Sequence, residues 1–192
     1  MCAISIDSEE MKRVAIHESG HAILAVKLGI VCHGVFFAYE PKHVGASGEI
    51  TGGRFCTPVG TKPPWNKNDY LQSAAGAGAE KLFFKVYNRD ASADDREMFS
   101  TSGAPEWEAT VDEAQMALAK NSEAVTQMTA TIISKHQNVP MRLWPDRGMD
   151  GRSTRFKQIL SDEEVLQMAG NGSTTEPSTQ NEPPQEENAK SV

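Results

Sequence analysis

The sequence lacks a long apolar run, an excess of basic residues and a framework of cysteines. Its apolar stretches fall far short of the ~20 residues that a helix needs to span a bilayer, and Met1–Asp7 does not look like a signal peptide. The net charge is −7, which argues against nucleic acid as the main partner because phosphate binding needs a basic face. The three cysteines have no metal-ligand spacing, so we expect reduced thiols and a cytoplasmic protein.

The 192 residues are enough for one domain with a sizeable core. We expect residues 1–7 to be a short lead-in and residues 8–168 to form the domain. Residues 169–192 are polar and hold almost nothing that could be buried, so they are predicted to be a disordered tail.

The apolar pattern predicts a mainly α fold with a small β-sheet beside the first helix. Long helices are expected over residues 8–28, 69–87 and about 106–136, and shorter ones after the polar loop 88–97 and over 161–168. Asn68 is the expected cap of the second long helix, and Ser161, with Glu164 three residues later, is the expected cap of the last helix. The residues rich in β-branched and aromatic side chains predict two strands, over 30–39 and 49–51.

The first predicted helix carries an H-E-x-x-H motif, made by His17, Glu18 and His21. Positions i and i+4 of a helix lie about 40° apart, so both imidazoles project from one face as two ligands of a single Zn²⁺ must. Glu18 would flank the metal and accept a proton from a metal-activated water. The alternative is a chance motif whose histidines form hydrogen bonds inside the core.

A catalytic zinc site takes three protein ligands, and the residues alone leave the third one open. Asp94 and Asp95 lie in the polar loop and are candidates, although an aspartate at a helix start is also a common cap. Glu80 follows a run of small residues on the second predicted helix and is another candidate. We expect that run to pack tightly against another helix, with the motif helix, which has its own Gly20, as one candidate partner. His33 and His43 fit no zincin spacing, so we expect neither to be a ligand.

Three motifs together resemble the peptidase domain of FtsH-type ATP-dependent zinc metalloproteases. VAIHESGHAILAV is similar to that family's H-E-A-G-H-A helix, residues 76–84 (GAGAEKLFF) resemble its second motif, G-R-A-A-E-E-L-x-F, and residues 90–94 (DASAD) resemble its third, G-A-x-x-D. The resemblance covers residues 8–168 and implies a helical zincin-type metallopeptidase domain. It further implies Zn²⁺ held by His17, His21 and Asp94, with Glu18 as the general base.

The sequence departs from the family where Ala77 and Asp90 replace the usual Arg and Gly, and these residues include neither an ATPase ring nor a membrane anchor. The resemblance therefore implies a zinc endopeptidase that acts on polypeptides, with a separate ATPase or unfoldase as a partner for folded substrates. One alternative is a catalytically silent adaptor or regulatory module with the same fold. Another is a metallopeptidase that cleaves one specific regulator.

Overall fold

The computed structural model describes residues 8–40, 49–55, 66–90, 92–100, 106–140, 142–143 and 155–170. The described helices are α1 (Ser8–Lys27), α2 (Lys67–Ser73), α3 (Ala75–Phe84), α4 (Ala93–Ser100), α5 (Trp107–Ala119), α6 (Ser122–His136) and α7 (Asp162–Gly170). The described strands are β1 (Val35–Glu40), β2 (Glu49–Phe55), β3 (Arg142–Leu143) and β4 (Arg155–Leu160). The fold is mainly helical with a small sheet, as predicted. No described helix is both long enough and apolar enough to cross a membrane.

The four described strands form one antiparallel sheet in the order β2-β1-β4-β3. The chain reaches β1 through Gly34, whose φ of 109° suits glycine. A Cβ atom at Gly34 would lie 2.3 Å from the carbonyl oxygen of Leu160 in β4, so only glycine permits this close approach.

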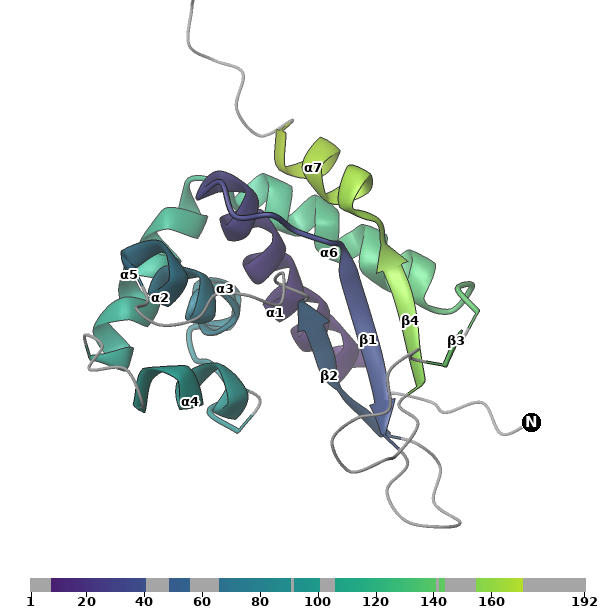
Figure 1. Ribbon diagram of the computed structural model, residues 1–192, viewed down its shortest axis with the longest axis horizontal. Coiled ribbons are helices and arrows are strands. Elements are labelled where there is room, and N and C mark those ends of the chain that lie inside the picture. The colour runs from purple at the N-terminus through teal and green to yellow at the C-terminus, as the bar shows by residue number, and fades with distance from the viewer. Residues whose placement is uncertain are drawn as a thin grey trace, which may run out of the picture.

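Helix α1 lies between the sheet and the helices α2 to α5 (Figure 1). It packs against α3 and α6 and also reaches β2 and α7. Its apolar side chains are buried almost all round, and they include Ala15, Ile16, Ala22, Ile23, Leu24 and Ala25. A helix that is apolar on every side belongs in a core, and the polar side chains of its motif are therefore held away from water.

The small residues of α3 pack directly against α1. A Cβ atom at Gly20 would lie 2.5 Å from Cβ of Ala79 and 2.6 Å from the carbonyl oxygen of Ala75. Such distances leave no room for any side chain at Gly20. The sequence predicted tight helix packing for this stripe, with the motif helix as a possible partner, and the structure confirms both.

Two predicted helices are each divided in two. The helix expected over 69–87 is broken at Ala74, and the one expected over 106–136 is broken between α5 and α6. The first of them begins earlier than predicted, because Asn66 and not Asn68 forms the cap: the Asn66 side chain accepts hydrogen bonds from the backbone of Asn68 and Asp69. The break at Ala74 matters for the site, because it places the carbonyl of Gln72 where α1 can reach it.

The strands differ more from the prediction than the helices do. The first begins at Val35 instead of residue 30, and β2 continues through Gly52 and Gly53 instead of ending there. Strand β4, which pairs with β1 in the middle of the sheet, was not predicted. Helix α7 has the predicted Ser161 cap but extends to Gly170, past the expected start of the tail. Residues 1–7 and 171–192 lie outside the described residues.

Candidate metal centre

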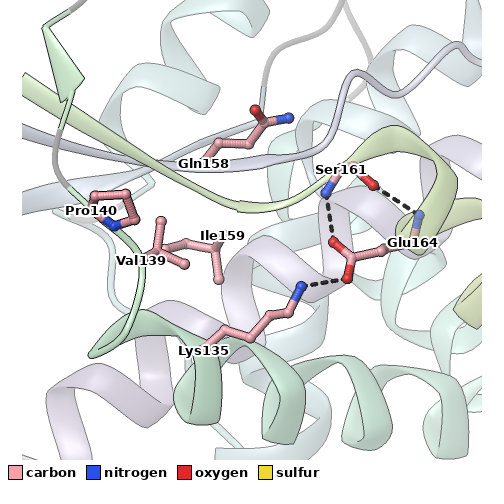
Figure 2. A pocket seen from close by; sticks show the side chains of 7 residues that line it. All are labelled: Lys135, Val139, Pro140, Gln158, Ile159, Ser161 and Glu164. Carbon is pink, nitrogen blue, oxygen red and sulfur yellow. Dashed lines mark hydrogen bonds and ion pairs between the residues drawn. The ribbon is translucent and has the colours of Figure 1, made fainter.

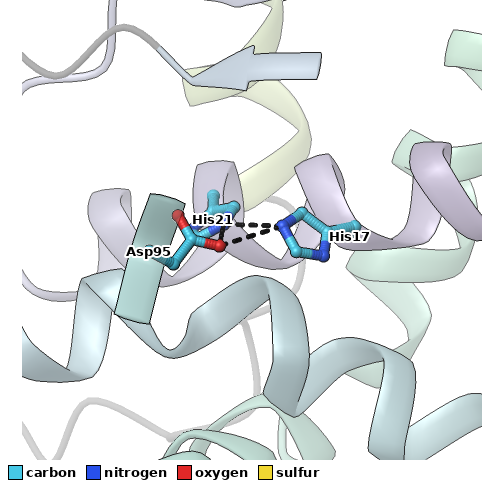
Figure 3. A group of neighbouring side chains, drawn as sticks. All are labelled: His17, His21 and Asp95. Atoms are coloured by element: carbon cyan, nitrogen blue, oxygen red, sulfur yellow. Dashed lines mark hydrogen bonds and ion pairs between the residues drawn. The ribbon is translucent and has the colours of Figure 1, made fainter. Parts of the chain in front are cut away.

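The two histidines of α1 turn the same ring nitrogen toward each other. His17 and His21 are 7% and 5% exposed, and their Nε2 atoms lie 3.1 Å apart. Both side chains project from one face of the helix, one turn apart (Figure 3). The spacing on one face is what the H-E-x-x-H motif predicted.

A carboxylate from α4 completes the group. Oδ2 of Asp95 lies 3.3 Å from Nε2 of His17 and 3.5 Å from Nε2 of His21, and Figure 3 shows it facing both rings. Among the described residues these three side chains form a group that could hold a metal ion. The structure thus places Asp95, one of the alternatives that the sequence left open, beside the two histidines. Asp94, which the family resemblance favoured, has its backbone in α4, but its side chain lies outside the described residues.

Glu80 contacts His17 on the side of the ring that faces away from Asp95 and His21. Its Oε1 is 2.8 Å from Nδ1 of His17, the ring nitrogen on the far side from Asp95. Its Oε2 accepts hydrogen bonds from Nη1 of Arg13 and from the backbone N–H of Asn88, both at 2.9 Å. Glu80 is fully buried, and these partners compensate for its burial. Its candidacy as the third ligand is therefore not supported by its position.

The second histidine is oriented by a backbone group. Nδ1 of His21 lies 2.9 Å from the carbonyl oxygen of Gln72, at the break between α2 and α3. A carbonyl only accepts, so Nδ1 of His21 carries a proton, and the Glu80 carboxylate requires the same of His17. Each neutral ring then presents a lone pair at Nε2. A histidine whose other nitrogen donates to a carboxylate or carbonyl has the orientation found in metal ligands.

Three acceptor atoms therefore converge: two imidazole Nε2 atoms and one carboxylate oxygen. They repel one another unless a cation lies between them, and that cation is either a proton or a metal ion. Burial disfavours a charged imidazole, but the nearby carboxylates of Asp95 and Glu80 outweigh it and raise the pKa of His17 to about 10. Asp95 shows the reverse: burial alone would raise its pKa, but the two histidines hold it well below the usual range.

The spacing of the three atoms fits a shared metal ion better than direct hydrogen bonds. Hydrogen bonds between an imidazolium and a carboxylate are about 2.7–2.9 Å long, whereas the two N···O distances are 3.3 and 3.5 Å. Ligands bonded at about 2.0–2.1 Å around a tetrahedral ion lie about 3.3–3.4 Å from each other. The three edges of the group, from 3.1 to 3.5 Å, bracket that value. The residues present thus fit a small tetrahedral cation.

Glu18 is buried beside this group with an unused oxygen. It is 3% exposed, and its Oε2 has no hydrogen-bond partner among the described residues. Burial raises the pKa of Glu18 above its ordinary value, although His17 and His21 oppose the shift. A buried polar atom without a partner is costly, and no described residue offsets that cost at Oε2 of Glu18.

The backbone of α3 passes close to the same convergence point. A Cβ atom at Gly76 would lie 2.3 Å from Nε2 of His17. The absence of a side chain at this position therefore keeps the ring nitrogen accessible. This requirement could not be read from the sequence, where Gly76 is one small residue among several.

A pocket elsewhere in the molecule shares no residue with the centre. It lies between α6, β4 and α7 (Figure 2), and two of its charged groups, Lys135 and Glu164, pair with each other. Glu164 also bonds to Ser161 at the start of α7. These polar groups already stabilise the helix ends, so nothing in the pocket points to a ligand.

Comparison of the sequence with known protein families and with curated proteins finds no match. Of the two histidines that were not expected to be ligands, His33 is exposed and outside the metal group, and His43 lies outside the described residues. The geometry of His17, Glu18, His21 and Asp95 is therefore the basis for the proposed function.

Proposed function

We propose that this protein is a zinc-dependent endopeptidase. The observation that carries the proposal is the convergence of two imidazole nitrogens and one carboxylate oxygen at tetrahedral spacing. Beside them lies a buried glutamate with an oxygen that no described residue bonds. Three protein ligands that leave one position open are typical of catalytic zinc, whereas structural zinc sites have four. The resemblance of the motifs to FtsH-type peptidases supports the same reaction.

The donor set suits Zn²⁺, which accepts two imidazoles and one carboxylate at bond lengths of about 2.0–2.2 Å. His17, His21 and Asp95 would hold the ion. When bound, it would supply Lewis-acid polarisation of the scissile carbonyl and lower the pKa of a water molecule at the open position.

The protein's own residues supply the remaining steps. Glu80 and the Gln72 carbonyl keep both Nδ1 atoms protonated, so that both Nε2 atoms stay available as ligands. Glu18 takes the proton of the attacking water on its carboxylate and passes it to the nitrogen of the leaving amine. Its Oε2, which has no partner among the residues that the structure describes, is the atom that we assign to this exchange.

The test is a Glu18→Gln variant, which keeps the shape of the side chain and removes the base. We expect wild-type protein to hold one zinc per chain and to cleave unfolded, fluorophore-quenched casein. The variant should keep its zinc and lose about 10²- to 10⁴-fold in rate. Glu10→Gln is the matched control, because Glu10 is an exposed residue of the same helix and its loss should not change the rate.

Two results would contradict the proposal. Full activity of Glu18→Gln would remove the proposed base, and wild-type protein without zinc would remove the metal. Protein that holds zinc but cleaves nothing under any of these conditions would instead favour the silent adaptor.

For folded substrates, a separate unfoldase is the partner that we propose.

A further inference from the structure

Of the three described side chains that form the metal group, Asp95 is the one that does not lie on α1. It belongs to α4, a helix of 8 residues. A helix this short is not stable alone in water, because its length gives too few hydrogen bonds to offset nucleation. Contacts with the rest of the protein must therefore hold α4 where Asp95 can reach the histidines.

Among the side chains of α4 that the structure describes, Phe99 makes such contacts. It follows Asp95 by four positions, so the two side chains lie on the same face of the helix, one turn apart. Phe99 is 9% exposed. The other side chains of α4 that the structure describes, Ala93, Asp95 and Arg96, are exposed or half-buried, so Phe99 is the one buried among them.

The ring of Phe99 lies between two other helices. Its centre is 5.2 Å from the ring of Tyr70 in α2 and 4.9 Å from that of Trp107 in α5, the latter at 90°. Edge-to-face pairs at such distances contribute beyond the area they bury. Trp107 is fixed in turn by a 3.0 Å hydrogen bond from its Nε1 to the hydroxyl of Tyr87. Phe99 thus binds α4 to a site that is itself fixed.

We propose that Phe99 is a positioning residue for the metal centre. The aromatic seat formed by Tyr70, Phe99 and Trp107 fixes α4 so that Oδ2 of Asp95 reaches Nε2 of both histidines. Metal affinity then depends on a side chain that is not itself a metal ligand. By linkage, metal binding must strengthen the packing of Phe99 in the seat to the same degree. The inference rests on the metal site of the proposed function.

The first test compares two variants of the full chain, Phe99→Leu and Phe37→Leu, each measured without zinc and with zinc bound. Phe99→Leu keeps an apolar side chain but loses the edge-to-face contact, and we expect about 10- to 100-fold weaker Zn²⁺ binding in competition with a chromophoric chelator. Phe37→Leu is the control, because Phe37 is fully buried in β1 and packs near His136 instead of α4. It should lower the melting temperature of the apo protein while changing zinc affinity less than about threefold.

The second test reads the seat directly and does not depend on the folding of Phe99→Leu. In a chain with Trp65→Phe and Trp144→Phe, Trp107 is the remaining tryptophan, and its emission should change as Zn²⁺ is added. Adding Asp95→Asn should abolish that change, because zinc held by the histidines alone no longer acts on α4.

The outcomes separate this inference from the function on which it rests. Wild-type protein that binds no zinc would overturn both. Zinc binding with equal affinities in Phe99→Leu and Phe37→Leu, or with unchanged Trp107 emission, would overturn the positioning role and leave the metal site intact.

Discussion

Glu80 shows how one residue can keep its charge inside the core. Burial alone would raise its pKa, but the hydrogen bonds from His17, Arg13 and the Asn88 backbone lower it. The guanidinium of Arg13 also lies 4.4 Å from the centre of the Phe84 ring, where the face of the ring attracts a cation. A single carboxylate therefore connects α1, α3 and the segment that leads to α4.

Lys85 carries a conformational cost that can be removed. It ends α3 with φ of 68°, a left-handed conformation that costs roughly 1–2 kcal/mol for residues with a Cβ atom. Lys85→Gly should therefore raise the free energy of unfolding by about 1 kcal/mol, measured by urea denaturation. Lys120→Gly is the matched control: Lys120 ends α5 with φ of −70°, so glycine there should destabilise by about 0.5–1 kcal/mol. Equal shifts in the two variants would refute the explanation.

At the scale of elements, the crossing of α1 and α3 affects both the stability of the fold and the space at the proposed metal site. Gly20→Ala would push a methyl group into the α3 backbone, and we expect a loss of about 1–3 kcal/mol in unfolding free energy. Gly76→Ala would push one against Nε2 of His17, so it should also weaken Zn²⁺ binding by about tenfold or more. Urea denaturation and chelator competition measure the two effects. If Gly76→Ala bound zinc as tightly as Gly20→Ala does, the role of Gly76 would be confined to packing.

The start of α7 should respond to acid. The hydrogen bond from Lys135 and those with Ser161 lower the pKa of Glu164. A carboxylate with a lowered pKa stabilises the fold above its unfolded-state pKa, and this contribution is lost as the pH falls through the folded-state value. Between about pH 5 and pH 3, the melting temperature should therefore fall more in wild type than in Glu164→Gln. The exposed Glu163 on the same helix provides the control: Glu163→Gln should follow wild type.

At the scale of the whole molecule, sequence reasoning succeeded where the information is local. The spacing of His17 and His21 and the Ser161 cap depend on residues a few positions apart, and both were predicted. The third ligand was left open because a contact between Asp95 and α1 depends on how α4 docks, which no local pattern encodes. Strand β4 was missed for a similar reason: its pairing with β1 joins distant segments. The break at Ala74 lies within a run of small residues that gives no local signal to end a helix.

The chain between His17 and Asp95 includes β1, β2, α2 and α3. A cation bound at both ends would act as a cross-link, and a cross-link stabilises a protein largely by restricting its unfolded chain. During synthesis the histidines leave the ribosome well before the aspartate does. In the proposed metal site, all three ligands are therefore present only after α4 has been translated, so the cross-link would form after the segments that it joins.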